Sequence, residues 1–410
     1  MGSYRANILT IGNELLNGSV LNSNGRFLGE ELTALGFKVI SQRSCRDRIY
    51  EIEQVLQEAL SETDLIVLTG GLGPTPDDVT REGVASFFKT SLRFSPQQYK
   101  KIAAFYKKRG KKIPAVVRRE ACFPAISHPI INRFGIALGF YIKTHDKMIV
   151  VLPGVPGELE KMFIESVIPI LSKHFKGLRR AHHLIVKAVG LSEPEVVQKL
   201  GQRFLEKEED LGIYPQSGQI SLRFPCRSVN HQAQVMARVR SKIGKHVFSY
   251  CDEDLEEVIG KLLLQKKWTL ATAESCSGGL VASLITNIVG ASQYFKGAVV
   301  AYDNQVKKHM LQVPEHVLKR HGAVSRQTAL YMARGVMQAL GTSVGLSITG
   351  VAGPGGGTQN KPVGTVAMAI CSEKKKQTFL FHFMGRRVYI QRRAAKKALE
   401  LLWYFLRSSK

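Results

Sequence analysis

Cysteine is scarce in this sequence, which has 6 cysteines among 410 residues. No two of them form a C-x-x-C pair, and the H-E-x-x-H arrangement of zinc hydrolases is missing as well. These absences argue against a secreted domain held by disulfides and against a zinc site built from neighbouring ligands. We therefore expect a cytoplasmic protein with reduced thiols.

Long apolar runs are also missing. None approaches the roughly 18 residues of a membrane-spanning helix, and the apolar run at 8–11 is too short for the core of a signal peptide. We therefore expect no membrane association. The hydrophobic fraction is 44% and the charged fraction 22%, which is ordinary for a folded protein. At roughly 100–200 residues per domain, the length predicts two to four domains.

Acidic residues are few relative to basic ones: 33 Asp and Glu stand against 58 Lys and Arg, a net charge of +25. Most of the surplus lies in two segments. Residues 96–120 hold nine Lys or Arg and one Glu (9 − 1 = +8), and residues 371–410 hold eleven against two (11 − 2 = +9). Such segments favour anionic partners, but a solvated basic face without a dedicated partner explains them about as well.

The apolar pattern divides the chain into three predicted pieces. In residues 1–170, short apolar runs at 6–12, 37–41 and 64–69 alternate with helical spacing, which is typical of a mostly parallel sheet covered on both faces. Residues 171–250 read as a small α+β module. Residues 251–410 again alternate strands and helices, so we expect a second α/β domain.

A glycine-rich loop ends the apolar run of the first piece. Residues 69–80 read T-G-G-L-G-P-T-P-D-D-V-T. Glycines at a strand end allow close approach of the backbone to an anion, and Asp77 and Asp78 offer the oxygen ligands that Mg²⁺ prefers. Taken alone, a turn followed by a helix cap is the more common explanation of this pattern.

The third piece contains E-S-C-S-G-G at 274–279, between a predicted strand and helix. A serine there is exposed at the edge of the sheet, and the following N–H groups, including those of Gly278 and Gly279, are suited to bind an oxyanion. Helix capping is the simpler alternative. A serine nucleophile needs a base, and Lys307 can serve if burial lowers its pKa. The loop at 349–358 suggests a phosphate cradle or a flexible surface loop; its candidate positions are Thr349, Gly350, Gly353, Gly355 and Gly356.

Taken together, the N-terminal motifs resemble the CinA (competence/damage-inducible) family. They are G-N-E-L-L at 12–16, the 69–80 string and L-P-G-V-P-G-E at 152–158. The resemblance implies a molybdopterin-binding-like domain with metal-dependent ADP-ribose pyrophosphatase activity. It implies a diphosphate site at Thr69, Gly70, Gly71 and Gly73. It also implies a divalent metal (Mg²⁺, Mn²⁺ or Co²⁺) near Asp78, Glu14 and Glu158. The family usually has Asp where Asn13 stands and Pro where Leu138 stands, so this site departs from its pattern.

The C-terminal strings are similar to the CinA C-terminal domain and to stand-alone nicotinamide mononucleotide (NMN) deamidases. This resemblance implies hydrolysis of NMN to nicotinate mononucleotide and ammonia in pyridine nucleotide recycling, with Ser275, Tyr302 and Lys307 as catalytic residues and no cofactor. G-L-S-E at 190–193 resembles the signature of the KH-like linker of the family. The resemblance also implies a homodimer acting on small nucleotides.

A different class of function stays open. The N-terminal domain would then be degenerate, with a competence- or DNA-damage-related role in binding nucleic acid or protein. A KH domain that clamps nucleic acid uses a G-x-x-G loop, and residues 171–250 contain none. The sequence therefore does not favour nucleic acid binding through this module.

Overall fold

The computed structural model describes residues 4–144, 146–178, 182–208, 211–216, 218–226 and 228–408. It divides into two compact units, one running to residue 181 and the other starting at residue 182. No helix within the described ranges combines the length and the apolarity that a bilayer span requires.

The first unit is built on a six-stranded sheet in the order β2-β1-β3-β8-β7-β6. Its first four strands run parallel, whereas β7 is antiparallel to β8 and β6 is antiparallel to β7. The strands are β1 (Arg5–Ile11), β2 (Lys38–Cys45), β3 (Leu65–Thr69), β6 (His128–Ile130), β7 (Gly139–Thr144) and β8 (Lys147–Leu152). A separate pair joins β4 (Leu92–Phe94) to β5 (Cys122–Pro124).

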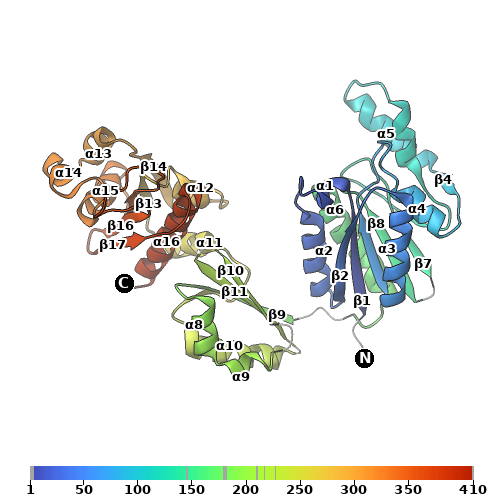
Figure 1. Ribbon diagram of the computed structural model, residues 1–410, viewed down its shortest axis with the longest axis horizontal. Coiled ribbons are helices and arrows are strands. Elements are labelled where there is room, and N and C mark those ends of the chain that lie inside the picture. The colour runs from blue at the N-terminus through green and yellow to red at the C-terminus, as the bar shows by residue number, and fades with distance from the viewer. Residues whose placement is uncertain are drawn as a thin grey trace. The chain divides into compact units, whose positions relative to one another are not determined.

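Helices cover both faces of this sheet (Figure 1). On α3, Ile52, Leu56 and Ala59 are buried, which is the spacing of one helix face packed on a sheet. Helices α2, α6 and α7 contribute to the core on one face, and α3 and α4 to the core on the other. The helices are α1 (Asn13–Leu16), α2 (Ser23–Ala34), α3 (Ile49–Glu62), α4 (Thr80–Phe87), α5 (Pro96–Lys108), α6 (Pro156–Met162) and α7 (Ile168–His174).

The second unit begins with a four-stranded antiparallel sheet in the order β10-β11-β9-β12. Strand β11 alternates between buried and half-buried residues, as expected when one face packs against helices. This part consists of β9 (His182–Val189), α8 (Glu193–Leu200), α9 (Gln202–Leu205), β10 (Gly212–Gln216), β11 (Gln219–Cys226), α10 (Val229–Ile243) and β12 (Val247–Ser249).

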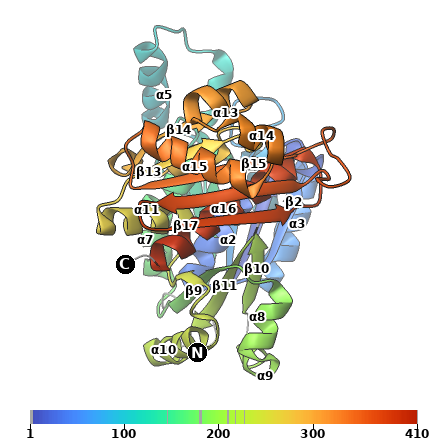
Figure 2. The same ribbon diagram turned by 90° about the vertical axis from the view of Figure 1, so that its left-hand side faces the viewer.

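A five-stranded sheet in the order β14-β13-β15-β16-β17 follows. Strands β14, β13 and β15 are parallel, and β16 and β17 are antiparallel additions. Helices α11, α12 and α16 pack on one face, and α13, α14 and α15 on the other (Figure 2). The elements are α11 (Leu255–Lys266), β13 (Leu270–Glu274), α12 (Leu280–Thr286), β14 (Phe295–Val300), α13 (Asn304–Leu311), α14 (Glu315–His321), α15 (Arg326–Ala339), β15 (Val344–Gly350), β16 (Thr365–Ser372), β17 (Lys376–His382) and α16 (Arg387–Ser408).

The two parts of the second unit share a hydrophobic core. Val189 and Phe248 belong to the same buried cluster as Trp403 of α16, and the Tyr404 hydroxyl lies 3.0 Å from His246 Nδ1. In the first unit, α7 runs across residue 170, and its Leu171 is buried in the core. The structure confirms the predicted fold class, two α/β sheets with a small α+β module, while the three-piece boundaries stay a prediction.

Candidate active site

Ser275 lies directly after β13, in the turn that leads into α12. It is 7% exposed, and its N–H donates to the carbonyl of Ile348 on the neighbouring strand β15 at 2.9 Å. Gly278 and Gly279 follow with φ of 65° and 94°, a left-handed backbone that favours glycine. The turn therefore holds the serine at the carboxyl edge of the sheet, where ligands of α/β proteins bind.

The buried carboxylate of Glu274 holds this turn through hydrogen bonds. It is fully buried and accepts hydrogen bonds from the N–H groups of Gly279 (3.1 Å), Val281 (3.1 Å) and Ala282 (2.8 Å). These donors are among the orphan N–H groups at the start of α12, and a negative charge there is favoured by the helix dipole. Glu274 thereby ties the end of the strand to the start of the helix on either side of Ser275.

The assignment of Gly278 and Gly279 as oxyanion donors was wrong. The N–H of Gly278 already donates to the carbonyl of Ser275 at 3.2 Å, and that of Gly279 donates to Glu274. In the described part of the chain, the N–H groups of Cys276 and Ser277 donate to no acceptor. The donors available for an oxyanion therefore lie one or two residues nearer to Ser275 than we expected.

Lys307 is the buried lysine of the site. Its side chain is only 1% exposed, and its Nζ lies 3.3 Å from Ser275 Oγ, 2.8 Å from the carbonyl of Ala301 and 3.2 Å from the carbonyl of Tyr302. Burial lowers its pKa below the ordinary value of 10.5. A neutral amine that donates its two hydrogens to the two carbonyls would have its lone pair left for the serine hydroxyl.

Tyr302 reaches the site through two different groups. Its backbone carbonyl accepts from Lys307, and its hydroxyl accepts from Arg387 at 2.8 Å. Arg387 also donates to the carbonyl of Gly353 at 2.9 Å. Sequence reasoning missed Arg387. It is one of eleven Lys or Arg in the basic segment 371–410, and charge alone does not distinguish it from the others.

These side chains enclose a cavity of about 160 Å³. Thr349 and Gly350 line it as predicted, whereas Gly353, Gly355, Gly356, Gly278 and Gly279 do not. Gly353 contributes only the carbonyl that Arg387 binds. The cavity is lined by Ser275, Cys276, Tyr302, Asn304, Lys307, Ala323, Val324, Thr349, Gly350, Ala352 and Arg387.

Cys276 is not a second nucleophile. It is 4% exposed, and burial raises the pKa of its thiol to about 12. Only the thiolate is a strong nucleophile, so this side chain stays protonated and inert near neutral pH. Among the side chains that line the cavity, this leaves Ser275, next to Lys307, as the candidate nucleophile.

The first unit has its own cavity of about 470 Å³ beyond the carboxyl ends of its parallel strands. All the predicted residues of this unit line it: Thr69, Gly70, Gly71, Gly73, Asp78, Glu14 and Glu158. A Cβ on Gly70 would lie 2.1 Å from the carbonyl oxygen of Ile11. This close approach, at a φ of 106°, requires glycine.

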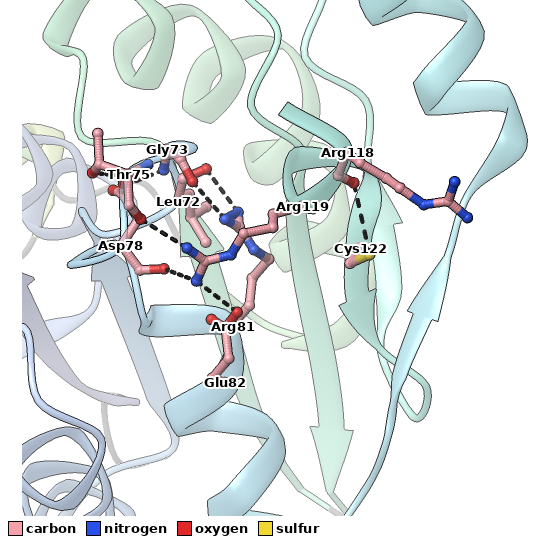
Figure 3. Close-up of polar contacts among 9 residues, drawn as sticks. All are labelled: Leu72, Gly73, Thr75, Asp78, Arg81, Glu82, Arg118, Arg119 and Cys122. Carbon is pink, nitrogen blue, oxygen red and sulfur yellow. Dashed lines mark hydrogen bonds and ion pairs between the residues drawn. The ribbon is translucent and has the colours of Figure 1, made fainter. Parts of the chain in front are cut away.

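Two arginines hold the glycine-rich loop from behind (Figure 3). Arg81, which is 1% exposed, donates to the carbonyls of Leu72 (2.7 Å) and Gly73 (2.6 Å). Arg119 donates to the carbonyls of Thr75 (2.8 Å) and Asp78 (3.0 Å). The arginines bind only carbonyls of the loop, but its N–H groups at Gly73 and Thr75 donate to the Asp78 carboxylate and so are not free for a ligand.

Comparison with known proteins identifies the family. Residues 252–406 match the CinA C-terminal domain, and residues 7–173 match a probable molybdopterin binding domain. A putative competence-damage inducible protein of Caldicellulosiruptor bescii is 34% identical over 404 residues, which cover 97% of this chain and 98% of that protein. The chain belongs to the CinA family.

Further relatives agree with this. A CinA-like protein of Thermotoga maritima is 36% identical over 408 residues, covering 98% of both chains. A solved structure described as CinA with unknown function, from Thermoplasma acidophilum, has 34% identity and a TM-score of 0.38, and it covers 41% of this chain and 98% of its own. The printed names of these relatives specify no reaction, so the activity of this CinA-family chain rests on its sites.

The metal site implied for the first unit is not assembled. The Asp78 carboxylate accepts from the N–H groups of Gly73 and Thr75, both at 2.8 Å, and Glu158 accepts from Asn132 at 2.6 Å. Among the described residues, no three His, Cys, Asp or Glu side chains are grouped to hold one ion. Asp78 therefore shapes the loop, and the assignment of a divalent metal to Asp78, Glu14 and Glu158 stays a prediction.

Glu120 is a residue of this cavity to which sequence reasoning gave no role. It is 2% exposed, and its Oε2 has no hydrogen-bond partner. Burial raises its pKa to about 7, with Asp78 and Glu158 adding to the rise and Arg81 opposing it. The carboxyl is therefore about half protonated near neutral pH, unlike an ordinary glutamate.

We predict that Glu274→Gln lowers the free energy of unfolding of the second unit by about 1–3 kcal/mol, since the amide nitrogen of glutamine would face N–H donors in a buried site. Urea-induced unfolding measures this loss. Ser277→Ala is the matched control in the same turn, because its buried hydroxyl has no partner. Equal stability of Glu274→Gln and the wild type would contradict the role assigned to the carboxylate.

Proposed function

We propose that the second unit is a nicotinamide mononucleotide deamidase, which converts NMN and water to nicotinate mononucleotide and ammonia. The contact between Lys307 Nζ and Ser275 Oγ, 3.3 Å long and buried, carries this proposal, since a serine needs an adjacent base to attack a carboxamide. The resemblance to NMN deamidases supports the choice of substrate. The cavity of about 160 Å³ suits one aromatic ring, with the rest of the nucleotide at its mouth.

The first step is attack by Ser275 Oγ on the carboxamide carbon while Lys307 takes the hydroxyl proton. A bond forms from Oγ to carbon, and the carbonyl π electrons move to oxygen. We assign the resulting oxyanion to the N–H groups of Cys276 and Ser277, which are free of acceptors in the described chain. Preorganised backbone donors of this kind stabilise the charge that develops in the transition state.

The second step expels ammonia. The carbon–nitrogen bond breaks as the protonated Lys307 returns its proton to the leaving nitrogen, leaving an ester on Ser275. A water molecule then adds to the ester with Lys307 again as the base, and Ser275 leaves with the proton. The carbonyls of Ala301 and Tyr302 hold Nζ in place throughout, so Tyr302 positions the lysine through its backbone.

We predict that Ser275→Ala and Lys307→Ala each lower ammonia release from NMN on the order of 10³-fold or more, because nucleophile and base act as a unit. Lys307→Arg should be as inactive as Lys307→Ala, since a guanidinium stays protonated. Coupled measurement of ammonia and nicotinate mononucleotide gives the rates. Ser277→Ala should stay close to the wild type, and full activity of either alanine variant at Ser275 or Lys307 would refute the mechanism.

The pH profile separates a base from a merely structural lysine. Burial disfavours the charged form, so the pKa of Lys307 lies below 10.5. The reactive neutral amine therefore accumulates as the pH rises through this lowered value, and kcat/KM should rise with it. The same rising limb in the residual activity of Lys307→Ala would contradict the assignment.

We propose that Arg387 binds the phosphate of the substrate. It lines the cavity, is exposed, and stands at the first residue of α16, while its two hydrogen bonds orient the guanidinium. A guanidinium binds phosphate through paired donors. This arginine replaces the glycines of the 350–358 loop as the main phosphate contact in the proposal.

We predict that Arg387→Gln raises the KM for NMN by roughly 10–100-fold, the loss expected for a charged hydrogen bond, while leaving the weak hydrolysis of nicotinamide riboside nearly unchanged. Steady-state kinetics with both substrates measures the difference. Tyr302→Phe is the control, because it removes the hydroxyl that holds Arg387 but keeps the cation. If Arg387→Gln weakens turnover of NMN and of nicotinamide riboside to the same extent, the arginine does not bind the phosphate.

The first unit has a second candidate function. We propose that its cavity binds a nucleotide diphosphate of the ADP-ribose class and cleaves it to AMP and ribose 5-phosphate. The glycine-rich loop and the volume of about 470 Å³ support this. The lining contains no Lys or Arg but includes Glu14, Asp47, Asp77, Asp78, Glu120 and Glu158, so added divalent cations should favour binding of the anion.

Glu120 supplies the test of this proposal. Without metal, ADP-ribose should bind more weakly as the pH rises from about 6 to about 8, because Glu120 becomes charged around its pKa of about 7. Glu120→Gln should bind with little change across this range. Calorimetry measures binding, and AMP release with Mg²⁺, Mn²⁺ or Co²⁺ measures cleavage. If ADP-ribose binds but no AMP is released with any of the three metals, the proposal that this site cleaves the diphosphate is refuted.

A further inference from the structure

The basic segment of the first unit forms a defined surface. It consists of α5, the loop after it and a 3₁₀ turn at Ala115–Ala121, and we call residues 96–118 the basic arm. Figure 1 shows α5 lying beyond the carboxyl ends of the parallel strands, away from the sheet. Eight of its cations are exposed: Lys100, Lys101, Lys107, Lys108, Arg109, Lys111, Lys112 and Arg118.

Helix α5 separates its apolar and basic faces. Ile102 is fully buried in a small cluster with Val117 and Ala121 of the 3₁₀ turn. At about 100° per residue, the four lysines of α5 fall within an arc of about 120° whose centre lies nearly opposite Ile102. Only Gln97 and Ala104 lie between them on that face, so the basic face contains no large apolar side chain.

The exposed cations of the arm lack acidic partners. Within the described ranges, none of the eight forms an ion pair, and only the ninth cation of 96–120, Arg119, does so, with Glu82 at 2.9 Å. The C-terminal basic segment differs, since its Lys396 and Lys397 pair with Glu256 and Glu400. The fold therefore pairs part of the C-terminal charge internally, whereas the charge of the arm stays exposed to solvent.

We propose that the basic arm binds the phosphate backbone of duplex nucleic acid. Lys100 and Lys107 are seven residues apart, as are Lys101 and Lys108, so each pair spans about 10.5 Å along the helix. A helix of about 10–12 Å diameter enters a major groove about 12 Å wide, with lysines facing its phosphates. Phosphate contacts carry no sequence information, so binding is independent of sequence.

The same face fits a membrane surface less well. Helices that lie on a bilayer insert a broad apolar face between the lipids, whereas the apolar face of α5 is packed against the 3₁₀ turn. The exposed large apolar residues of the arm are Ile113, at 36%, and Val116, at 56%, and neither lies on α5. A partner held by charge alone, such as nucleic acid, therefore matches the arm better.

Salt dependence gives the proposal a quantitative signature. Each phosphate neutralised by a lysine releases counterions, and the slope of log K against log salt is about −0.9 per contact. Removing the four lysines of α5 should make the slope less steep by about 3–4. A general attraction to a chain of net charge +25 would instead respond to the loss of any four charges.

The test compares two quadruple variants of the full chain. The arm variant replaces Lys100, Lys101, Lys107 and Lys108 by Gln, which keeps the helix propensity. The control replaces four exposed lysines elsewhere in the first unit by Gln: Lys38, Lys143, Lys173 and Lys176. Fluorescence anisotropy measures the affinity for a duplex of about 20 base pairs, the length of two helical turns. The measurement runs from about 50 to about 300 mM KCl, a range that includes physiological salt.

We expect the arm variant to lose at least about tenfold in affinity, with the flatter slope, and the control variant to stay near the wild type. Equal losses of affinity in both variants would show that binding depends on the net charge of the chain and not on the arm, and would overturn the proposal. Arm-dependent binding to vesicles of anionic lipid, without binding to the duplex, would also overturn it. Unchanged unfolding of the first unit and unchanged deamidase activity verify that the arm variant is folded.

Discussion

The candidate active site depends on the burial of one lysine. Lys307 lies at the start of α13 beneath the end of β14, and the carbonyls of Ala301 and Tyr302 accept from it. Those carbonyls belong to the chain just beyond the strand, where they are no longer used by the sheet ladder. Because they satisfy two donors and leave no carboxylate in contact with Nζ, burial can favour the neutral amine. In the proposed mechanism, this neutral amine is the base for Ser275.

The two units solve a similar problem in different ways. Each has a parallel sheet whose carboxyl edge carries a turn with glycines at positive φ. In the second unit, a buried carboxylate, Glu274, holds the turn through its N–H groups. In the first unit, Arg81 and Arg119 hold the loop through its carbonyls. The Asp78 carboxylate also accepts from the N–H groups of Gly73 and Thr75, so in both units a carboxylate uses part of the backbone donors that could bind an anion.

Sequence reasoning predicted the fold and selected two residues that the structure brings into contact, Ser275 and Lys307, but not the details of their surroundings. Alternating strands and helices predict both sheets because each pattern reflects burial, which is local in sequence. Ser275 and Lys307 stand in recognisable strings, and the structure brings them together. Gly278 and Gly279 were misassigned because glycine content reports backbone freedom and not where an N–H points. Arg387 was missed because α16 brings it to the site from more than eighty residues beyond Tyr302, a distance that no local pattern spans.

The short 3₁₀ turn at Ala115–Ala121 serves three structures at once. Its Val117 supports α5, its Arg119 binds the carbonyls of Thr75 and Asp78, and its Glu120 lines the cavity. A seven-residue turn cannot shift at one end without moving the other. The turn therefore connects the arm, the loop and the cavity lining, and any coupling between occupancy of the arm and occupancy of the cavity would be equal in both directions.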